Sequence, residues 1–450
     1  EVIPQVLMEL VVNEADGNPF YVEELIKMMI EEGVIQKGGD NWRVEPGKLA
    51  SLRVPPTLNG VLQVRLSTMP ADEREILQVA AVIGRVFWDE AIEDLCCNEE
   101  REVPEGRDCR RILLSLAGRE VIYSRPHSTF ASAQEFVFKH NLFHEVTYGT
   151  VSVEQRRRYH AETARWLAEH SGDRVDEFSG WVADHFERAG EFAEAARWYL
   201  RAGLRAAAQY ANADAVDYFG RALEFTPPNQ MEQSCAILLE RARVFDLLGE
   251  REHELSDIQQ LEEIADRLGD PLYQAETALR QASIAEITGG YMASAQQAQR
   301  AIRLGEEAGI TRCVAEGYLR WGIVLMRQNE PTSARTQLEQ ALHLARLANL
   351  TRLEGESLRN LGIVNRMLGQ VKQAREYHEQ ALQMSRRTGD RRGESSALVS
   401  LGVVASELSA RVSLDTWKSG RSVRTTAPRV TDTWAPASRP TERCRRGRRT

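Results

Sequence analysis

The chain has 450 residues, of which 42% are hydrophobic and 27% are charged, and its formal net charge is -9 at pH 7. This length gives room for about three domains of ordinary size. No stretch approaches the ~18 consecutive apolar residues of a membrane-spanning helix, so we expect no membrane partner. The six cysteines form no Cys-x-x-Cys pair, and therefore indicate neither a disulfide framework nor a zinc site.

Charge is distributed unevenly along the chain. Residues 411–450 contain eleven Lys or Arg and three acidic residues, which leaves a net charge of -17 for residues 1–410. An acidic body repels phosphate backbones, so we do not expect the main structure to bind nucleic acid. The chain begins at Glu1 without a leader sequence. We therefore expect a fragment of a longer, cytoplasmic protein.

Residues 17–33 have the pattern of a capped helix. Asn18 can act as N-cap, Pro19 fits the first helical position, and Gly33 suits the left-handed conformation after a helix end. The apolar runs 34–36 and 42–44 flank a glycine turn and predict a small β-hairpin.

Residues 55–148 predict several helices, a second hairpin and a final helix. Apolar stripes at helical spacing end near Leu66, Ile83 and Leu116, and the runs 121–123 and 136–138 are β-like. Three helices followed by a hairpin is the order of a winged helix. The polar segment 125–134 predicts a loose tip for the wing.

Residues 153–225 predict an Ala-rich helical connector that ends at Pro227 and Pro228. A repeat with a period of 40 residues begins near Met231. Small residues fall in register in three columns, which are Ala242, Ala282, Gly322, Gly362, Gly402; Gly249, Gly289, Asn329, Gly369, Ser409; and Gly269, Gly309, Asn349, Gly389. A period of this length is typical of a solenoid of helix pairs, in which each unit buries its apolar face against its neighbours.

The small residues also have a structural explanation. Gly and Asn in two of the columns suit left-handed turns between helices. A glycine inside a helix costs about 1 kcal/mol relative to alanine, so Gly322 and Gly362 need a close helix contact that compensates.

The repeat ends abruptly after Ser409. Residues 411–450 are rich in Arg, Thr, Ser and Pro without an apolar period, and we expect them to be disordered. Two origins stay open: a genuine basic tail, or a shift of reading frame near codon 410. Resequencing the gene across that codon would distinguish them.

Four blocks together resemble the predicted ATPases of the STAND signalling class, in which an AAA-like core is followed by a helical lid, a winged helix and a MalT-like TPR array. The blocks are residues 17–25 (GNPFYVEEL), 54–58 (VPPTL), 77–87 (LQVAAVIGRVF) and 136–140 (FVFKH). The resemblance covers residues 1 to about 410. Many relatives are bacterial regulators, and the second and third blocks look most like the branch linked to class III adenylate/guanylate cyclases.

The resemblance implies a nucleotide switch. In such proteins ATP and magnesium lie between core and lid, and the lid proline packs near adenine. It therefore suggests that Gly17, Asn18 and Pro19 form the adenine side of a lid, although a plain helix cap explains the same three residues.

The chain departs from this class in one respect. It contains no Gly-x-x-x-x-Gly-Lys-Ser/Thr loop, because Gly47-Lys48 is followed by Leu49 and lacks the upstream glycine. Phosphates need a cradle of backbone N–H groups and a lysine. We therefore expect no cofactor and no catalysis in this chain, with ATP and magnesium held by an upstream ATPase core of the longer protein.

Two other groups of residues have the spacing of a metal site or of a DNA-binding surface. His140 and His144 have the spacing of two metal ligands, but no third ligand stands out, and we assign them structural roles and no metal. Arg107, Arg110, Arg111 and Arg119 could face DNA from a winged helix, but in the STAND class the comparable module packs inside the protein as a hinge.

For partner binding, the first helix of each TPR unit usually lines the groove. We predict that Arg280, Arg320, Asn360 and Asn365 contact a protein or an acidic or extended peptide there, with a plain solvated surface as the alternative. Trp321 shares a column with Leu361 and Leu401 and is assigned to the core.

We therefore expect a mainly α fold, with a winged-helix domain followed by an α-solenoid of TPR-like helix pairs. The expected segments are a lid remnant (1–50), the winged helix (51–150), a connector with degenerate TPR units (151–228), the solenoid (229–410) and the tail (411–450). The expected function is signal sensing and partner docking in a STAND-type regulator. The alternatives are the C-terminal region of a class III cyclase and a LuxR-type transcription activator.

Overall fold

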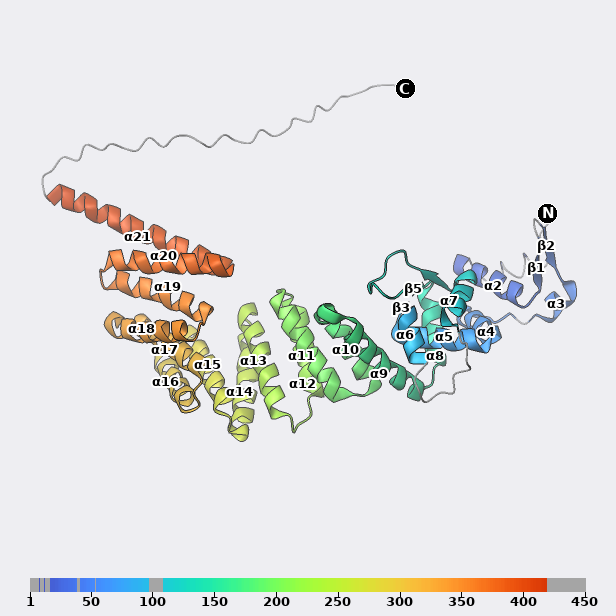
Figure 1. Ribbon diagram of the computed structural model, residues 1–450, viewed down its shortest axis with the longest axis horizontal. Helices are drawn as coiled ribbons and strands as arrows, with labels where there is room; N and C mark the ends of the chain where they lie inside the picture. The colour runs from blue at the N-terminus through green and yellow to red at the C-terminus, as the bar shows by residue number, and fades with distance from the viewer. Residues whose placement is uncertain are drawn as a thin grey trace, which may run out of the picture. The chain divides into compact units, whose positions relative to one another are not determined.

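A computed structural model describes residues 17–38, 41–52, 54–96 and 108–418, together with the single residues 8 and 12 (Figure 1). The described chain is mainly α-helical, as predicted. It divides into two compact units, residues 1–280 and 281–450. In the described part, no helix combines the length and the apolar character needed to cross a membrane.

The first unit begins with helix α2 (Pro19–Glu31), strands β1 (Ile35–Gly38) and β2 (Asn41–Val44), and helix α3 (Pro46–Ser51). The predicted cap is confirmed, because Asn18 Oδ1 accepts hydrogen bonds from the backbone N–H groups of Phe20 (3.0 Å) and Tyr21 (3.3 Å). Gly33 has φ 68°, and the two strands pair antiparallel as predicted. The turn residues Gly39 and Asp40 lie outside the described residues.

A second group of elements contains the predicted helices and hairpin together with one further strand. These elements are α4 (Leu58–Thr68), α5 (Ala71–Ile83), β3 (Val86–Trp88), α6 (Asp89–Cys96), α7 (Cys109–Gly118), β4 (Ile122–Ser124), β5 (Glu135–Phe138) and α8 (Asn141–Thr150). The strands form an antiparallel sheet in the order β3-β5-β4. Strand β3 was not predicted from the sequence, because a strand of three residues is too short to show alternation. We call residues 58–150 the winged module.

The segment between β4 and β5 is not the loose tip that was predicted. Phe130 is buried and packs edge-on against Trp88 and Trp166, with ring centroids 4.9 and 5.1 Å away. The buried carboxylate of Glu135 accepts hydrogen bonds from the N–H and hydroxyl groups of Thr129. One aromatic anchor and one buried acid therefore fix a segment whose composition is otherwise polar.

The rest of the first unit consists of helices that pack in sequence. They are α9 (Val153–His170), α10 (Val175–Ala189), α11 (Phe192–Ala208), α12 (Asn212–Phe225), α13 (Met231–Leu248), α14 (Arg251–Leu268) and the start of α15 (Pro271–Ile287), with a short 3-10 helix, Gly172–Arg174, before α10. Core side chains run continuously from the winged module into α9–α13.

The second unit repeats one helix pair. After the end of α15 it contains α16 (Tyr291–Glu307), α17 (Thr311–Arg327), α18 (Pro331–Leu347), α19 (Thr351–Met367), α20 (Val371–Thr388) and α21 (Arg391–Lys418). Helices α15, α17, α19 and α21 start at residues 271, 311, 351 and 391, which confirms the period of 40 residues. The predicted left-handed turns are confirmed at Gly249, Gly269, Gly289, Gly309, Asn329, Asn349, Gly369 and Gly389, which all have positive φ.

The structure differs from two predictions about the C-terminal region. Ser409, in a turn column of the repeat, lies inside α21 rather than in a turn. Helix α21 also continues through residues 411–418, which were assigned to the tail, and residues 419–450 lie outside the described residues.

Candidate functional site

The predicted lid motif lies at the start of α2. Gly17 has φ 77°, Asn18 caps the helix and Pro19 is its first residue. All three residues are exposed, so the motif is open to a partner or ligand.

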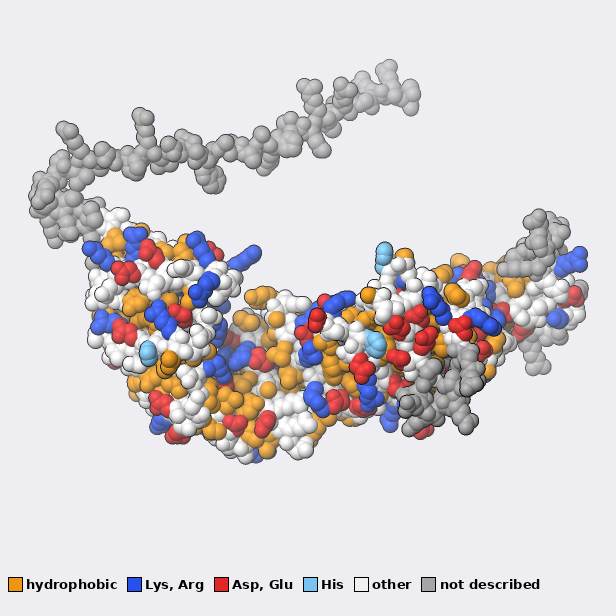
Figure 2. Space-filling model, in the orientation of Figure 1, with side chains coloured by type: hydrophobic (Ala, Val, Ile, Leu, Met, Phe, Trp, Pro, Cys, Tyr) orange, Lys and Arg blue, Asp and Glu red, His pale blue; other side chains and the backbone are white. Residues whose placement is uncertain are grey.

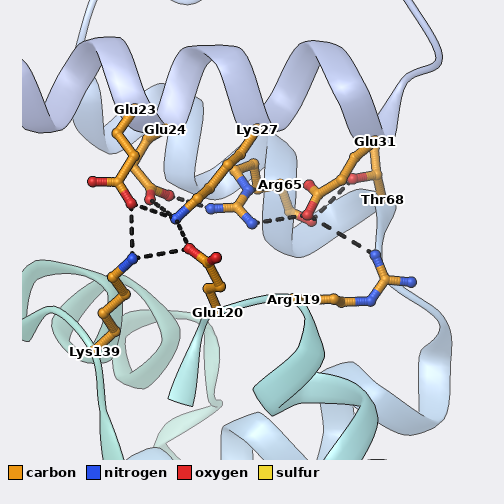
Figure 3. Close-up of polar contacts among 9 residues, drawn as sticks. All are labelled: Glu23, Glu24, Lys27, Glu31, Arg65, Thr68, Arg119, Glu120 and Lys139. Atoms are coloured by element: carbon orange, nitrogen blue, oxygen red, sulfur yellow. Dashed lines mark hydrogen bonds and ion pairs between the residues drawn. The ribbon is translucent and has the colours of Figure 1, made fainter. Parts of the chain in front are cut away.

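A cluster of charged residues joins α2 to the winged module (Figure 3). Arg65, on α4, is at its centre, and its side chain is only 1% exposed. Its Nε and Nη2 atoms donate to the two carboxylate oxygens of Glu31, at 3.0 and 2.8 Å, and its Nη1 donates to Glu24. We call this group the lid–module cluster; its members are Glu23, Glu24, Lys27, Glu31, Arg65, Arg119, Glu120 and Lys139.

Two lysines complete the cluster. Lys139 Nζ donates to Glu23 (2.8 Å) and to Glu120 (3.0 Å), and Lys27 Nζ lies 2.6 Å from Glu23 and 3.1 Å from Glu120. Hydrogen bonds from Lys139 and Lys27 lower the pKa of Glu23 to about 2. Burial opposes the charge of Lys139, but its hydrogen bonds to Glu23 and Glu120 outweigh burial and raise the pKa of Lys139. The Glu23–Lys139 pair therefore stays fully ionised at neutral pH.

This cluster was not predicted from the sequence. A signal for Arg65 was present, because it follows Val61 by four residues and so lies on the apolar stripe of its helix. A charge on a buried stripe indicates a buried partner. The partners themselves lie 34 and 41 residues away and had no local signal.

The two histidines at helical spacing have separate surroundings. The ring of His140 packs against Phe20, with centroids 4.1 Å apart, and His144 Nε2 donates to the carbonyl of Ala81 at 2.9 Å. Within the described residues, Glu23, Glu24 and His140 place possible metal ligands within 4.8 Å of one another. Both carboxylates already pair with Lys27, Lys139 or Arg65, so protein cations neutralise this group.

The arginines that could face DNA from a winged helix differ in their exposure and ion pairing. Arg110 and Arg111 are exposed on α7, whereas Arg119 is paired with Glu73 at 2.9 Å. Arg107 lies outside the described residues. Acidic and basic side chains are interspersed on the face of the first unit drawn in Figure 2.

The predicted partner-binding residues lie on helices α15, α17 and α19. Arg280, on α15, is 8% exposed. In the second unit, Arg320 lies between Glu316 (3.5 Å) and Glu286 (3.9 Å). Arg327 lies 4.0 Å from Glu286, a residue that was not singled out from the sequence.

The two asparagines are turned toward their own helix. Asn360 Nδ2 donates to the carbonyl of Glu356 at 2.9 Å, and Asn365 Nδ2 donates to that of Leu361 at 2.8 Å. Asn365 is only 1% exposed, so a partner reaches it only if the side chain moves. Trp321 packs at the edge of the second unit's core, as predicted.

Among protein families, the tetratricopeptide repeat matches residues 311–387 and, in a second register, residues 353–410. The second unit therefore contains tetratricopeptide repeats. No curated protein matches the chain.

Several solved structures are similar. A Signal Transduction ATPase with Numerous Domains (STAND) protein with a tetratricopeptide repeat sensor, from Pyrococcus horikoshii, matches at 12% identity and a TM-score of 0.40, over 90% of this chain and 60% of that chain. This chain thus spans less than two thirds of that protein's length. A thermophilic TPR protein of Thermus thermophilus matches at 22% identity and a TM-score of 0.35, over 45% of this chain and 99% of that chain. Aspartyl phosphate phosphatase F of Bacillus subtilis matches at 11% identity and a TM-score of 0.38, over 90% and 95%.

Proposed function

We propose that this chain is the regulatory and sensor part of a STAND-type signalling ATPase, and that it docks a protein or peptide through its repeats. The observation that carries the proposal is the tetratricopeptide array of residues 311–410, because such arrays are built to present an extended binding surface. The five segments predicted from the sequence, from lid remnant to tail, are part of this proposal.

Charge indicates the class of partner. Helices α17 and α19 carry six arginines and three glutamates, and residues 281–410 contain sixteen Lys or Arg and thirteen acids. An acidic, extended peptide is complementary to this surface. Arg320 is the proposed anchor, because it is held in place by Glu286 and Glu316 and still keeps a fifth of its side chain exposed.

The lid motif supports the assignment to a STAND-type ATPase. Gly17, Asn18 and Pro19 are exposed at the start of α2, where the adenine of a nucleotide held by an upstream core would lie. The lid–module cluster connects that helix to the winged module. A change at the nucleotide would thereby reach the rest of the first unit.

Within the STAND class, residues 54–58 and 77–87 favour the branch linked to class III adenylate/guanylate cyclases. The genomic sequence upstream of Glu1 tests this assignment. A cyclase domain followed by an ATPase core supports it, and a DNA-binding domain in place of the cyclase contradicts it.

The docking surface can be tested with a fluorescently labelled glutamate-rich peptide and a lysine-rich peptide of the same length. We expect anisotropy titrations to show binding of the acidic peptide alone. Arg320→Gln should weaken binding about tenfold, or ~1.4 kcal/mol. Glu286→Gln should strengthen it, because it releases one intrachain partner of Arg320.

Arg375→Gln is the matched control, since Arg375 lies exposed on a second helix, α20, and pairs only with its neighbour Glu379 among the ion pairs described. Circular dichroism shows whether each variant folds. Equal binding of both peptides, or equal effects of the α17 and α20 substitutions, would contradict docking at this surface.

A separate measurement tests the incomplete nucleotide site. Isothermal titration calorimetry of the 450-residue chain with ATP and magnesium should show no tight binding, since the phosphate-binding loop is absent from the sequence. A sub-micromolar dissociation constant would overturn the assignment of ATP to the upstream core.

A further inference from the structure

A cavity of about 540 Å³ lies in the first unit, where the winged module meets the first two helices of the connector. Its walls come from the turn between α5 and β3, from α8, and from α9 and α10. Residues of this wall include Gly84, Val86, Tyr148, His160, Trp181 and His185. With His144, the cavity brings three histidines from three helices to one place.

Two of these histidines and Tyr148 form a chain of hydrogen bonds that links α8, α9 and α10. Tyr148, on α8, and His160, on α9, are joined by their hydroxyl and Nε2 at 3.0 Å. The Nδ1 atoms of His160 and His185, on α10, lie 2.9 Å apart.

A neutral imidazole carries one proton, so when both rings are neutral one Nδ1 atom donates to the other. The ring that donates through Nδ1 has an acceptor at its Nε2, and the other ring has its proton on Nε2. The Tyr148 hydroxyl can donate to His160 Nε2 or accept from it. We call this arrangement the histidine relay.

The end of helix α5 borders the same cavity. The last carbonyls of a helix have no intrahelical donor. His144 from α8 donates to the carbonyl of Ala81. Gly84 follows with φ 147° and ψ -174°, a conformation that side chains disfavour. The end of α5 therefore lines the cavity together with His160 and His185.

We propose that the histidine relay is a proton-sensitive joint, which adds to the packing of α9 and α10 on the winged module while His160 and His185 are both neutral. A proton added at the accepting Nδ1 atom would place two N–H groups against each other. If His160 is then doubly protonated, its Nε2–H leaves the Tyr148 hydroxyl able only to accept.

The cations around the relay also disfavour protonation of its two rings. Arg156 lies over the ring of Tyr148 at 4.6 Å, Arg85 and Arg188 line the cavity, and all are cations. Asp184 and Glu145 are the acids of the cavity wall. Asp184 already pairs with Arg188, Arg221 and Tyr199, and Glu145 accepts from Asn141, so neither is free to neutralise a protonated relay.

Burial is the largest effect on both rings. It lowers the pKa of His160 to about 3 and that of His185 to about 4, with nearby His185 and Arg188 adding to the shift of His160. Both values lie below the ordinary pKa of about 6.5, so the closed joint binds fewer protons than the open one. The joint is therefore most stable above about pH 6.5, and it weakens as the pH falls from there toward 4.

Hydrogen exchange of the whole chain tests the proposal, with rates corrected for the intrinsic effect of pH. Between pH 7.5 and 5.0 we expect the opening equilibrium of α9, α10 and the end of α5 to rise about thirtyfold for each imidazole that opening exposes. Helices α16 and α17 serve as the internal reference, because residues 291–327 contain no histidine.

The variants His160→Gln and His185→Gln should each make the rise of the opening equilibrium between pH 7.5 and 5.0 about thirtyfold smaller. The ratio of the opening equilibria at the two pH values can be measured even if a variant is less protected at pH 7.5. His253→Gln is the control, since His253 is exposed on α14 and should change nothing. The proposal is overturned if both relay variants keep the full pH dependence, or if the wild-type joint is equally protected at both pH values.

A second measurement does not depend on the variants. In the whole chain labelled with 15N-histidine, nuclear magnetic resonance reports the tautomer of each neutral ring. We expect opposite tautomers at His160 and His185, with the proton on Nδ1 of one ring and on Nε2 of the other. The same tautomer at both rings would show that the hydrogen bond between the two Nδ1 atoms does not exist.

Discussion

The variant Arg65→Met should lower the free energy of unfolding of the first unit by about 3–5 kcal/mol. Arg65 is buried, and the substitution leaves the carboxylates of Glu24 and Glu31 with only their longer ion pairs to Lys27 (3.5 Å) and Arg119 (3.9 Å). Glu24 is only 2% exposed, so water cannot replace the lost partner. Urea unfolding followed by circular dichroism measures the loss, and hydrogen exchange in α2 and α4 locates it.

A compensated variant separates charge from packing. Arg65→Met combined with Glu24→Leu and Glu31→Gln should recover most of the stability, because it removes the unpaired charges together. Arg375→Met is the control, as its exposed pair with Glu379 should contribute no more than about 0.5 kcal/mol. A loss of less than about 1 kcal/mol for Arg65→Met would show that the lid–module cluster does not hold α2 on the module.

The variant Gly362→Ala should destabilise the repeat array by about 1–3 kcal/mol. A Cβ atom at this position would lie 2.4 Å from Cε1 and 2.6 Å from both nitrogens of the His378 ring. His378 is 1% exposed on α20, so its ring cannot move aside without opening the contact between α19 and α20. This steric cost exceeds the ~1 kcal/mol that alanine gains in helix propensity.

Two glycines of the same column supply the comparison. Gly322→Ala should also be destabilising, because its Cβ would lie 2.7 Å from Cγ of Leu338. Gly402→Ala should be neutral or stabilising by up to about 1 kcal/mol, since among the described residues no atom beyond its chain neighbours and its own helix backbone lies within 4 Å of the added carbon. Equal thermal and urea stability of all three variants would show that close helix approach is not the reason for these glycines.

Several features of the fold were predicted from the sequence because their signals are local or periodic. The turns at Gly309 and Asn349 need a left-handed backbone, which few residue types tolerate, and they recur every 40 residues. The same holds for Gly322 and Gly362, whose cost inside a helix is visible without knowledge of the partner helix. The cap at Asn18 involves only the next three residues.

The candidate sites were predicted less completely. Arg320 was identified from its column, but its partner Glu286 lies 34 residues away on another helix. Asn365 was chosen from the same pattern, yet it is buried and bonded to its own helix. Periodicity identifies the helix that a residue occupies, whereas its exposure depends on the helices packed around it.

By itself the sequence determined the helix pairs, their period, their turns and the absence of a phosphate-binding loop, because each of these depends on neighbouring or regularly spaced residues. Only the tertiary structure decided the burial of Phe130, the ion pairs of Arg65 and the contact of His160 with His185. These join residues on different elements, 25 residues apart for the two histidines and 34 for Arg65 and Glu31, without a periodic signal. Which polar groups meet across such distances is decided by chain packing, since a buried charge or imidazole is stable only where the fold supplies its partner.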